Sequence, residues 1–329
     1  METLDTTILP VPISVSDATI RIENKLKSQK LSVVKFLRKT AILTLAITIG
    51  NPLSLLFIGI INRIFFRFID TAFVCYAASE FYRDNYGFKI VNSVSLNYPS
   101  LVGVYFQGGK VGLIFGITSV EKDFKNAANL TKFMRNVDLI KNLLGVRAFH
   151  YSGILPTELA KHALIPKGYL TERCDIVAKV VIAAEKYVRQ LEGITEQLPV
   201  ILLGGRGNVG RKITQGLKEL GRESHVLDLG DQIPEILRNR RCIVIDVARK
   251  GALEEHIANF WNGMIFLNET YPSPKKGTIQ KLKNLGIPCY HVTGVAAKAF
   301  PKFPGPYANG VPCCALITDK NLQAVVKAL

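Results

Sequence analysis

Residues 199–210 read PVILLGGRGNVG, a short apolar run that ends in spaced glycines. Gly205, Gly207 and Gly210 form the pattern G-x-G-x-x-G, and a helical pattern continues to residue 220. A strand that turns directly into a helix through such glycines is typical of dinucleotide-binding folds. The first glycine permits a tight turn, the second admits a pyrophosphate, and the third lets the helix pack closely on the strand. We therefore predict that NAD or NADP is bound by Gly205, Arg206, Gly207, Asn208, Val209 and Gly210.

A second predicted strand, at 224–229, carries an acidic residue 18 positions after the last glycine of the motif, Asp228. A carboxylate at this place accepts a hydrogen bond from the ribose 2′-hydroxyl, which favours NAD over NADP. Arg206 and Arg222 leave NADP open, because a guanidinium accommodates the 2′-phosphate. The sequence alone does not choose between the two cofactors.

The segments that follow the motif indicate the fold class. Further strands are predicted at 242–247, 264–267 and 289–292, with helical segments between them. This alternation predicts an α/β protein with a Rossmann-type, doubly wound parallel sheet in its C-terminal half. Ligands of such sheets lie beyond the carboxyl ends of the strands, which points to Asp246 and the turn 247–251, and to segments 268–274 and 293–295.

Upstream of the motif, the pattern predicts a smaller N-terminal α/β domain. Strands are expected at 71–77, 101–106, 111–117 and 146–151, and helices at 120–144 and 155–165. A helix over 175–191 leads into the glycine motif. The 329 residues suit about two domains. We predict a basic and apolar helical segment at 1–69, an N-terminal α/β domain at 70–175 and a Rossmann domain at 176–329.

The apolar stretch 41–61 contains 21 residues and no charge, which is long enough for a membrane span. Gly50, Asn51 and Pro52 interrupt it, and a proline inside a helix is costly. The stretch therefore predicts two half-helices, about 31–49 and 53–69, that meet at Asn51-Pro52. At helical spacing, a narrow polar stripe would be formed by Gly59, Asn62, Arg63, Arg67 and Asp70.

Basic residues on both sides of this stretch bear on its orientation. A single span would carry a nucleotide-binding domain out of the cytosol, whereas a hairpin in one leaflet keeps both ends cytosolic. We expect a cytoplasmic protein that is peripheral or monotopic on the cytosolic face of a membrane. A core hairpin, a homodimer interface and a true span are the alternatives. The flanking basic residues are Lys25, Lys27, Lys30, Lys35, Arg38 and Lys39 before the stretch, and Arg63 and Arg67 after it.

The six cysteines show no C-x-x-C pair, so neither a metal site nor a disulfide framework is expected. Cys313 and Cys314 follow Pro312, which is placed to begin a helix. A cysteine at a helix N-terminus has a lowered pKa and becomes a usable nucleophile. The alternative is that both thiols are small buried hydrophobes.

The net charge of +16 favours anionic partners, which include a phospholipid surface, a nucleotide and an acidic protein. No nucleic-acid motif and no interleaved basic and aromatic run is present, so no nucleic-acid partner is expected. The composition, 48% hydrophobic with 21% charged residues, excludes a disordered or disulfide-dense chain.

The order of these segments resembles the long-chain acyl-(acyl-carrier-protein) reductases of cyanobacteria, within the wider group of shikimate-dehydrogenase and glutamyl-tRNA-reductase relatives. The similar stretches lie between about 110 and 318, and the apolar hairpin lies outside them. The resemblance implies reduction of a fatty acyl thioester through a cysteine, here Cys313 or Cys314, and an acyl-carrier protein as partner. It is carried by residues 116–121, 153–156, 180–191, 205–210, 269–272 and 313–315.

Two hypotheses follow from these patterns. The first is a membrane-associated NAD(P)-dependent oxidoreductase that acts on a lipophilic carbonyl or acyl thioester substrate. The second is a non-catalytic dinucleotide-binding sensor or scaffold at the membrane. They are distinguished by hydride transfer to a substrate, which only the first requires.

Overall fold

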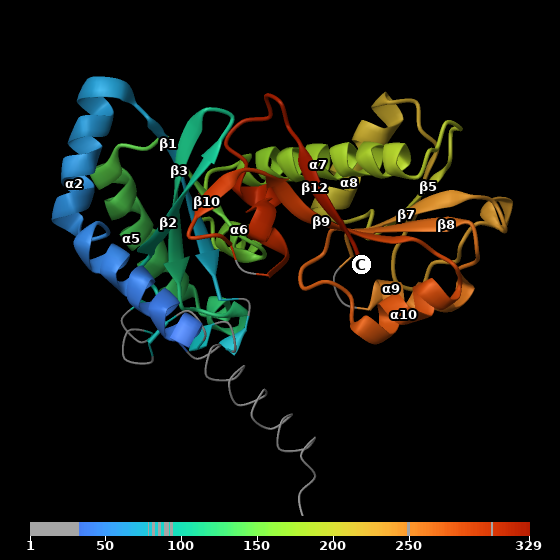
Figure 1. The fold of residues 1–329 in the computed structure, drawn as a ribbon, viewed down its shortest axis with the longest axis horizontal. Helices are drawn as coiled ribbons and strands as arrows, with labels where there is room; N and C mark the ends of the chain where they lie inside the picture. Colours follow the sequence, from blue (N-terminus) through green and yellow to red (C-terminus); the bar gives the residue numbers. More distant parts are fainter. Residues whose placement is uncertain are drawn as a thin grey trace, which may run out of the picture.

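The computed structural model describes residues 33–77, 79–80, 83–84, 87–88, 92, 95–248, 251–303 and 305–329. The chain forms two sheets that lie side by side, with helices packed against both (Figure 1). The predicted basic positions Lys25, Lys27 and Lys30 lie outside the described residues, as do the rest of 1–32 and residues 249–250 of the turn 247–251.

The C-terminal sheet confirms the predicted doubly wound fold. Its strand β5 (Val200–Leu203) pairs in parallel with β6 on one side and with β7 on the other, and β8 and β9 extend the sheet in parallel. Antiparallel strands β11 and β12, which the sequence did not predict, pair with β9. The strands are β6 (Ser224–Leu227), β7 (Cys242–Asp246), β8 (Met264–Asn268), β9 (Cys289–Ala296), β11 (Gly310–Val311) and β12 (Ala324–Ala328).

Helices cover both faces of this sheet because the side chains of each strand alternate between them. Along β5, Val200 and Leu202 join the core beneath one helical layer, whereas Ile201 and Leu203 join the core beneath the other. In Figure 1, α7 and α8 lie on one face, and α9 and α10 on the opposite face. The helices are α7 (Tyr169–Leu191), α8 (Asn208–Glu219), α9 (Ala252–His256) and α10 (Lys276–Asn284).

The N-terminal sheet has the strand order β10-β2-β3-β1-β4. The predicted hairpin is present, and Gly108 and Gly109 make its turn at positive φ. The outer strand β10 comes from the C-terminal half of the chain and is antiparallel to β2. The elements are β1 (Ile69–Tyr76), β2 (Ser100–Gln107), β3 (Lys110–Ile117), β4 (Ala148–Tyr151), β10 (Lys298–Phe300), α5 (Ala127–Leu144) and α6 (Leu155–Lys161).

Short turns of helix complete the described elements. They are the π-helical turn η1 (Asn62–Phe66) and the 3-10 turns η2 (Glu121–Lys125), η3 (Glu235–Leu237), η4 (Ile257–Asn259), η5 (Gly305–Asn309) and η6 (Cys313–Ala315).

The apolar stretch forms the predicted pair of helices. The helix Val33–Thr48 and the segment Pro52–Phe65, which contains α2 (Pro52–Ile61), meet at an angle of 68°. Asn51 caps α2 by accepting a 3.0 Å hydrogen bond from the Ser54 backbone N–H. Within the described residues, no single helix is long and apolar enough to cross a membrane, and only this bent pair meets the requirement by length and composition.

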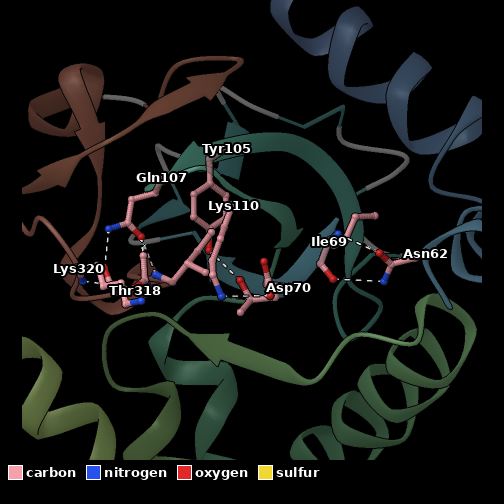
Figure 2. A network of polar contacts seen from close by, with 10 residues as sticks. Asn62, Ile69, Asp70, Tyr105, Gln107, Lys110, Thr318 and Lys320 are labelled. Carbon is pink, nitrogen blue, oxygen red and sulfur yellow. Dashed lines mark hydrogen bonds and ion pairs between the residues drawn. The ribbon is translucent and has the colours of Figure 1, made fainter. Parts of the chain in front are cut away.

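Two residues of the polar stripe of this hairpin, Gly59 and Asn62, are buried against protein, whereas Arg63 and Arg67 are exposed. Gly59 lies against the Leu143 backbone of α5 so closely that a Cβ there would overlap it. Asn62 is buried, and it bonds the backbone N–H and C=O of Ile69 (Figure 2). The predicted helical spacing is wrong for Asp70, because the helix has ended and Asp70 lies in β1.

Polar contacts join the N-terminal sheet to the C-terminal segment (Figure 2). Gln107 accepts a 2.8 Å hydrogen bond from the Ile317 backbone N–H and donates one of 2.8 Å to the Thr318 carbonyl. Tyr105, which is fully buried, donates to the carbonyl of Ala315 at 2.8 Å. The segment that carries Cys313 and Cys314 is therefore tied to β2 of the N-terminal sheet.

Candidate dinucleotide and substrate site

The glycine loop is closely packed, but its turn at positive φ is made by Gly204 and not by Gly205, the first glycine of the predicted motif. Gly204 adopts φ +82°, and a Cβ there would lie 2.7 Å from Cα of Ala248. A Cβ on Gly210 would lie 2.3 Å from the Gly204 carbonyl oxygen. These contacts bring the start of α8 against the end of β5, at the point where the strand order reverses.

The middle glycine of the motif has few atoms packed against it. Gly207 lines the cleft, and a Cβ there would meet only the Gly204 carbonyl, at 3.2 Å. Gly207 is the N-cap of α8, and no side chain caps this helix. The backbone N–H groups at a helix start bind anions well. The residues Gly207, Asn208 and Val209 therefore fit the pyrophosphate of a dinucleotide.

Asp228 lies at the end of β6, beside the loop. Its Oδ2 accepts a 3.1 Å hydrogen bond from the Arg206 backbone N–H. Sequence reasoning missed Asp231, which forms an ion pair with Arg206 at 2.8 Å and accepts a 2.8 Å hydrogen bond from the Asp228 N–H. Hydrogen bonds from the Asp228 backbone N–H and from the Arg206 side chain lower the pKa of Asp231. The same contact with Asp231 raises the pKa of Arg206. Two carboxylates thus accompany one guanidinium where the ribose is expected.

Arg222 does not belong to this site. Its guanidinium bonds the carboxylate of Glu185, a fully buried residue of α7 that also pairs with Arg189. Arg222 is absent from the described residues that line the cleft. The predicted role of Arg222 toward an NADP phosphate is therefore wrong, because its guanidinium is paired with Glu185 of α7 instead.

A cleft of about 1030 Å³ runs from the glycine loop between the two sheets. One end contains Gly207, Asn208 and Asp228, and the other reaches the helix Val33–Thr48. Its middle includes the two C-terminal cysteines. The candidate polar groups around these cysteines are Cys75, Arg173, Glu269, Tyr271 and Tyr307.

Cys313 and Cys314 both line the cleft, in the single 3-10 turn η6. Burial raises the pKa of Cys314 to about 11, although the charge of Arg173 acts in the opposite direction. Burial, reinforced by the Glu269 charge, raises the pKa of Cys313 well above its ordinary value. The expected lowering of the pKa is wrong, because a three-residue turn has little dipole and the thiols are desolvated.

Arg173 of α7 is a site residue that sequence reasoning missed. It is buried, donates a 2.7 Å hydrogen bond to the Cys314 carbonyl and lies 3.3 Å from Nε2 of His150. Burial and the Arg173 charge lower the pKa of His150 to about 3, so His150 is neutral. The predicted helix began at residue 175, so Arg173 fell outside it, although the apolar stripe continued one turn back from Val177 would have reached Arg173.

Polar side chains also lie at the carboxyl ends of β7 and β8, as predicted. Asp246 is buried, and its Oδ1 accepts a 3.0 Å hydrogen bond from the Ala248 N–H. Burial raises the pKa of Asp246 to about 7. Asn268 is buried beside His291, with Nδ2 and Nδ1 2.8 Å apart. Neither Asp246 nor Asn268 is among the cleft-lining residues, so the predicted position at the ligand is wrong for both, and their hydrogen bonds hold the strand ends instead.

Within the described part of the chain, no three His, Cys, Asp or Glu side chains are arranged to hold a metal ion.

No protein-family model matches the sequence, and no curated protein matches it significantly. Several solved structures are similar to the chain, and two dehydrogenases and a reductase are among them. The L-tryptophan dehydrogenase of Nostoc punctiforme is 15% identical, with a TM-score of 0.34 over 67% of this chain and 69% of that one. A D-lactate dehydrogenase of Treponema pallidum is 13% identical, with a TM-score of 0.29 over 66% and 76%. A glyoxylate reductase of Paecilomyes thermophila is 13% identical, with a TM-score of 0.25 over 67% and 81%.

None of these three is an acyl-(acyl-carrier-protein) reductase. At such identities and TM-scores, the likeness does not indicate what this chain binds or converts. The fold class rests on the strand order of the C-terminal sheet and on the glycine loop at its reversal point.

Proposed function

We propose that this protein is an NAD(P)-dependent oxidoreductase that acts on a lipophilic carbonyl or acyl thioester substrate. The observation that carries the proposal is one continuous cleft that contains both the glycine loop and Cys313 and Cys314. A cofactor held at the first would face a substrate held near the second. A bound reduced nicotinamide supplies a hydride, which is the chemistry that a carbonyl carbon accepts.

Different residues of this chain would bind the cofactor and position the cysteines. Gly207, Asn208 and Val209 would bind the pyrophosphate through the start of α8, and Asp228 would accept from a ribose hydroxyl. Arg173 would hold the η6 turn in place through its bond to the Cys314 carbonyl.

For a thioester substrate, Cys313 or Cys314 would be the nucleophile. Its sulfur would bond to the carbonyl carbon as the carbon–sulfur bond to the carrier breaks, and the proton of the thiol would leave with the carrier thiol. The raised pKa of both thiols means that a base must remove this proton during attack. Glu269 also lines the cleft and is coupled electrostatically to both thiols, which makes it the candidate base.

We further propose that the protein acts at the cytosolic face of a membrane, where lipophilic substrates reside. The exposed apolar side chains of α2 support this location, since Leu53 is 80% and Phe57 65% exposed. An acidic acyl-carrier protein is a second proposed source of substrate, because the chain carries a net charge of +16.

The proposal is tested by calorimetric titration of the detergent-solubilised protein with NADH and with NADPH. Gly207→Trp is the control, because its side chain would project into the cleft beside the loop. We expect one dinucleotide to bind the native chain and neither to bind the variant. Absence of binding to the native chain would remove the oxidoreductase assignment.

Turnover is then measured on long-chain acyl thioesters and on aldehydes, with Cys313→Ala and Cys314→Ala beside the native chain. Loss of thioester turnover in one variant supports the covalent route. If both variants retain it, the covalent route is wrong and direct carbonyl reduction remains.

A non-catalytic dinucleotide sensor or scaffold is the second candidate function. The raised pKa values of Cys313 and Cys314 favour it, because neutral thiols are poor nucleophiles. Cofactor binding without hydride transfer to any acyl thioester or aldehyde would support this function over the first.

A further inference from the structure

The helix Val33–Thr48 presents different side chains on two sides. One side lines the cleft with the apolar residues Ile42, Leu43 and Ala46. The other side is exposed and also apolar, and it includes Leu37 and Ile47, each about 60% exposed. A helix with apolar side chains on both sides separates two apolar environments. The cleft is one of them.

A second wall of the cleft is a sheet face, which belongs to a different core cluster from the one that Leu45 of the helix contacts. Phe73 of β1, Val102 of β2 and Ile114 of β3 line it, and Phe73 is paired with Ile114 in the register. Phe303 adds a ring whose centroid lies 6.2 Å from that of Phe73. We call the part of the cleft that is lined by the helix and by these side chains the apolar arm, and Cys75 and Cys314 line the same cleft.

The outer environment is identified by charge. Residues 33–69 contain five basic side chains and no acidic one. Two of them, Arg63 and Arg67, are exposed beyond α2, whereas Arg38 and Lys39 line the cleft. The exposed apolar side chains of α2 continue this surface, through Leu53, Phe57 and Ile60. Apolar side chains with basic neighbours fit the interface of an anionic bilayer.

We infer that the helix Val33–Thr48 admits a single aliphatic chain from an anionic bilayer into the cleft, with the chain along Ile42, Leu43 and Ala46 and its carbonyl end toward the thiols. This inference rests on the proposed function and adds a route by which its substrate enters the cleft. The alternative is delivery from solution, either free or on a carrier protein. The experiment therefore compares the two.

The first measurement is binding of cis-parinaric acid, a fluorescent straight-chain fatty acid, to the full-length protein. Ala46→Trp would fill the arm, whereas Ala41→Trp places the same side chain on the exposed side of the same helix. We expect at least a tenfold weaker affinity for Ala46→Trp and an unchanged affinity for Ala41→Trp. Equal affinities in all three proteins would overturn the inference.

NADH and NADPH titrations of the same three proteins separate this result from the proposed function. The glycine loop lies at the other end of the cleft, so we expect both variants to keep the dinucleotide affinity of the native chain. If Ala46→Trp binds both the dinucleotide and parinaric acid like the native chain, the proposed function stands and only the inferred binding of an aliphatic chain in the arm is wrong. Lost dinucleotide binding in Ala46→Trp would mean that the variant misfolds, and Ile42→Gln then replaces it with the same expectation.

The second measurement identifies the source of the chain. A photoreactive diazirine fatty acid is delivered in phosphatidylglycerol vesicles, in phosphatidylcholine vesicles, or as a soluble albumin complex, and labelled peptides are mapped. We expect labelling of residues 42–46 and of the sheet wall, strongest from the phosphatidylglycerol vesicles. Labelling confined to Leu53 and Phe57 would overturn the inference, as would equal labelling of the arm from all three sources.

Discussion

The guanidinium of Arg173 donates a 2.7 Å hydrogen bond to the carbonyl oxygen of Cys314, which lies 141 residues further along the chain. The same side chain approaches Nε2 of His150 on β4 at 3.3 Å. One buried cation therefore joins the long helix α7, the N-terminal sheet and the turn that carries both cysteines. This contact fixes the position of the thiols relative to both sheets.

The Arg173→Met substitution should destabilise the protein and slow the alkylation of the Cys314 thiol. The variant leaves a buried carbonyl and a buried imidazole without their donor, which typically costs about 1–3 kcal/mol. It also removes the charge that holds the pKa of Cys314 down, so this thiol should alkylate more slowly at pH 9. Urea unfolding and iodoacetamide labelling measure the two effects. Arg173→Lys keeps the charge, so an alkylation rate as slow as that of Arg173→Met would contradict the electrostatic cause.

Gly207→Ala and Gly210→Ala form a matched pair, because the first should lower dinucleotide affinity and the second should lower stability. At Gly210 a Cβ would lie 2.3 Å from a backbone oxygen, so the substitution should cost about 1–3 kcal/mol of stability. At Gly207 the Cβ meets one atom at 3.2 Å, so stability should change by less than about 0.5 kcal/mol while dinucleotide affinity falls. Thermal unfolding and calorimetry check both. A Gly207→Ala protein that binds like the native chain would argue against a pyrophosphate at this place.

The native chain should bind NADH more tightly than NADPH, because Asp228 and Asp231 repel a 2′-phosphate. The isosteric double variant Asp228→Asn with Asp231→Asn removes both charges and releases Arg206 from its ion pair. We expect the ratio of the two affinities to move toward NADPH by about tenfold, or 1.4 kcal/mol. Asp319→Asn serves as the control, since Asp319 pairs with Lys179 and does not line the cleft. An equal change in the control would indicate an effect of net charge alone.

Asp246 should make the protein less stable as the pH rises from about 4 to about 7. Its pKa is raised to about 7 in the folded state, so the folded state holds a proton that the unfolded chain has already lost. The stabilising contribution is complete below the unfolded pKa and is lost as the pH rises through 7. Asp246→Asn keeps an acceptor for the Ala248 N–H and removes the titration. The difference in melting temperature between variant and native chain should therefore grow from pH 4 to pH 7, and parallel curves would refute the assignment.

Phe57→Asp should weaken binding to anionic vesicles without lowering stability, because the Phe57 side chain is 65% exposed. Leu220→Asp is a matched control in the C-terminal domain, where Leu220 is 52% exposed at the end of α8. Co-sedimentation with phosphatidylglycerol vesicles measures binding, and thermal unfolding measures stability. If both variants sediment like the native chain, α2 does not contact the bilayer.

The elements that the sequence predicts well are those with strong local signals. The run 199–210 specifies a strand, a turn and a helix through its own glycines, and the structure has them at Val200–Leu203 and Asn208–Glu219. Gly50, Asn51 and Pro52 likewise mark the bend between the two N-terminal helices. In both cases the backbone conformation is determined by the residue types at the break itself.

Features that depend on distant parts of the chain were not predictable in this way. The pKa of Cys313 and Cys314 is set by burial and by Arg173 and Glu269, which are remote in sequence. The stripe of Gly59 and Asn62 has the same pattern whether it faces lipid headgroups or, as here, α5 and β1. Asp231 needed the fold of the β6 loop to bring it to Arg206.

The strand β10 gives the N-terminal sheet a particular order of assembly. Residues 69–151 supply four of its strands, but the strand that covers β2 is formed by Lys298–Phe300. During synthesis, the hydrogen-bonding edge of β2 therefore remains uncovered until some 150 further residues have left the ribosome. An open edge is a site for misplaced pairing with another chain. The emerging protein thus depends on the late arrival of residue 300, or on a chaperone until then, to close its first sheet.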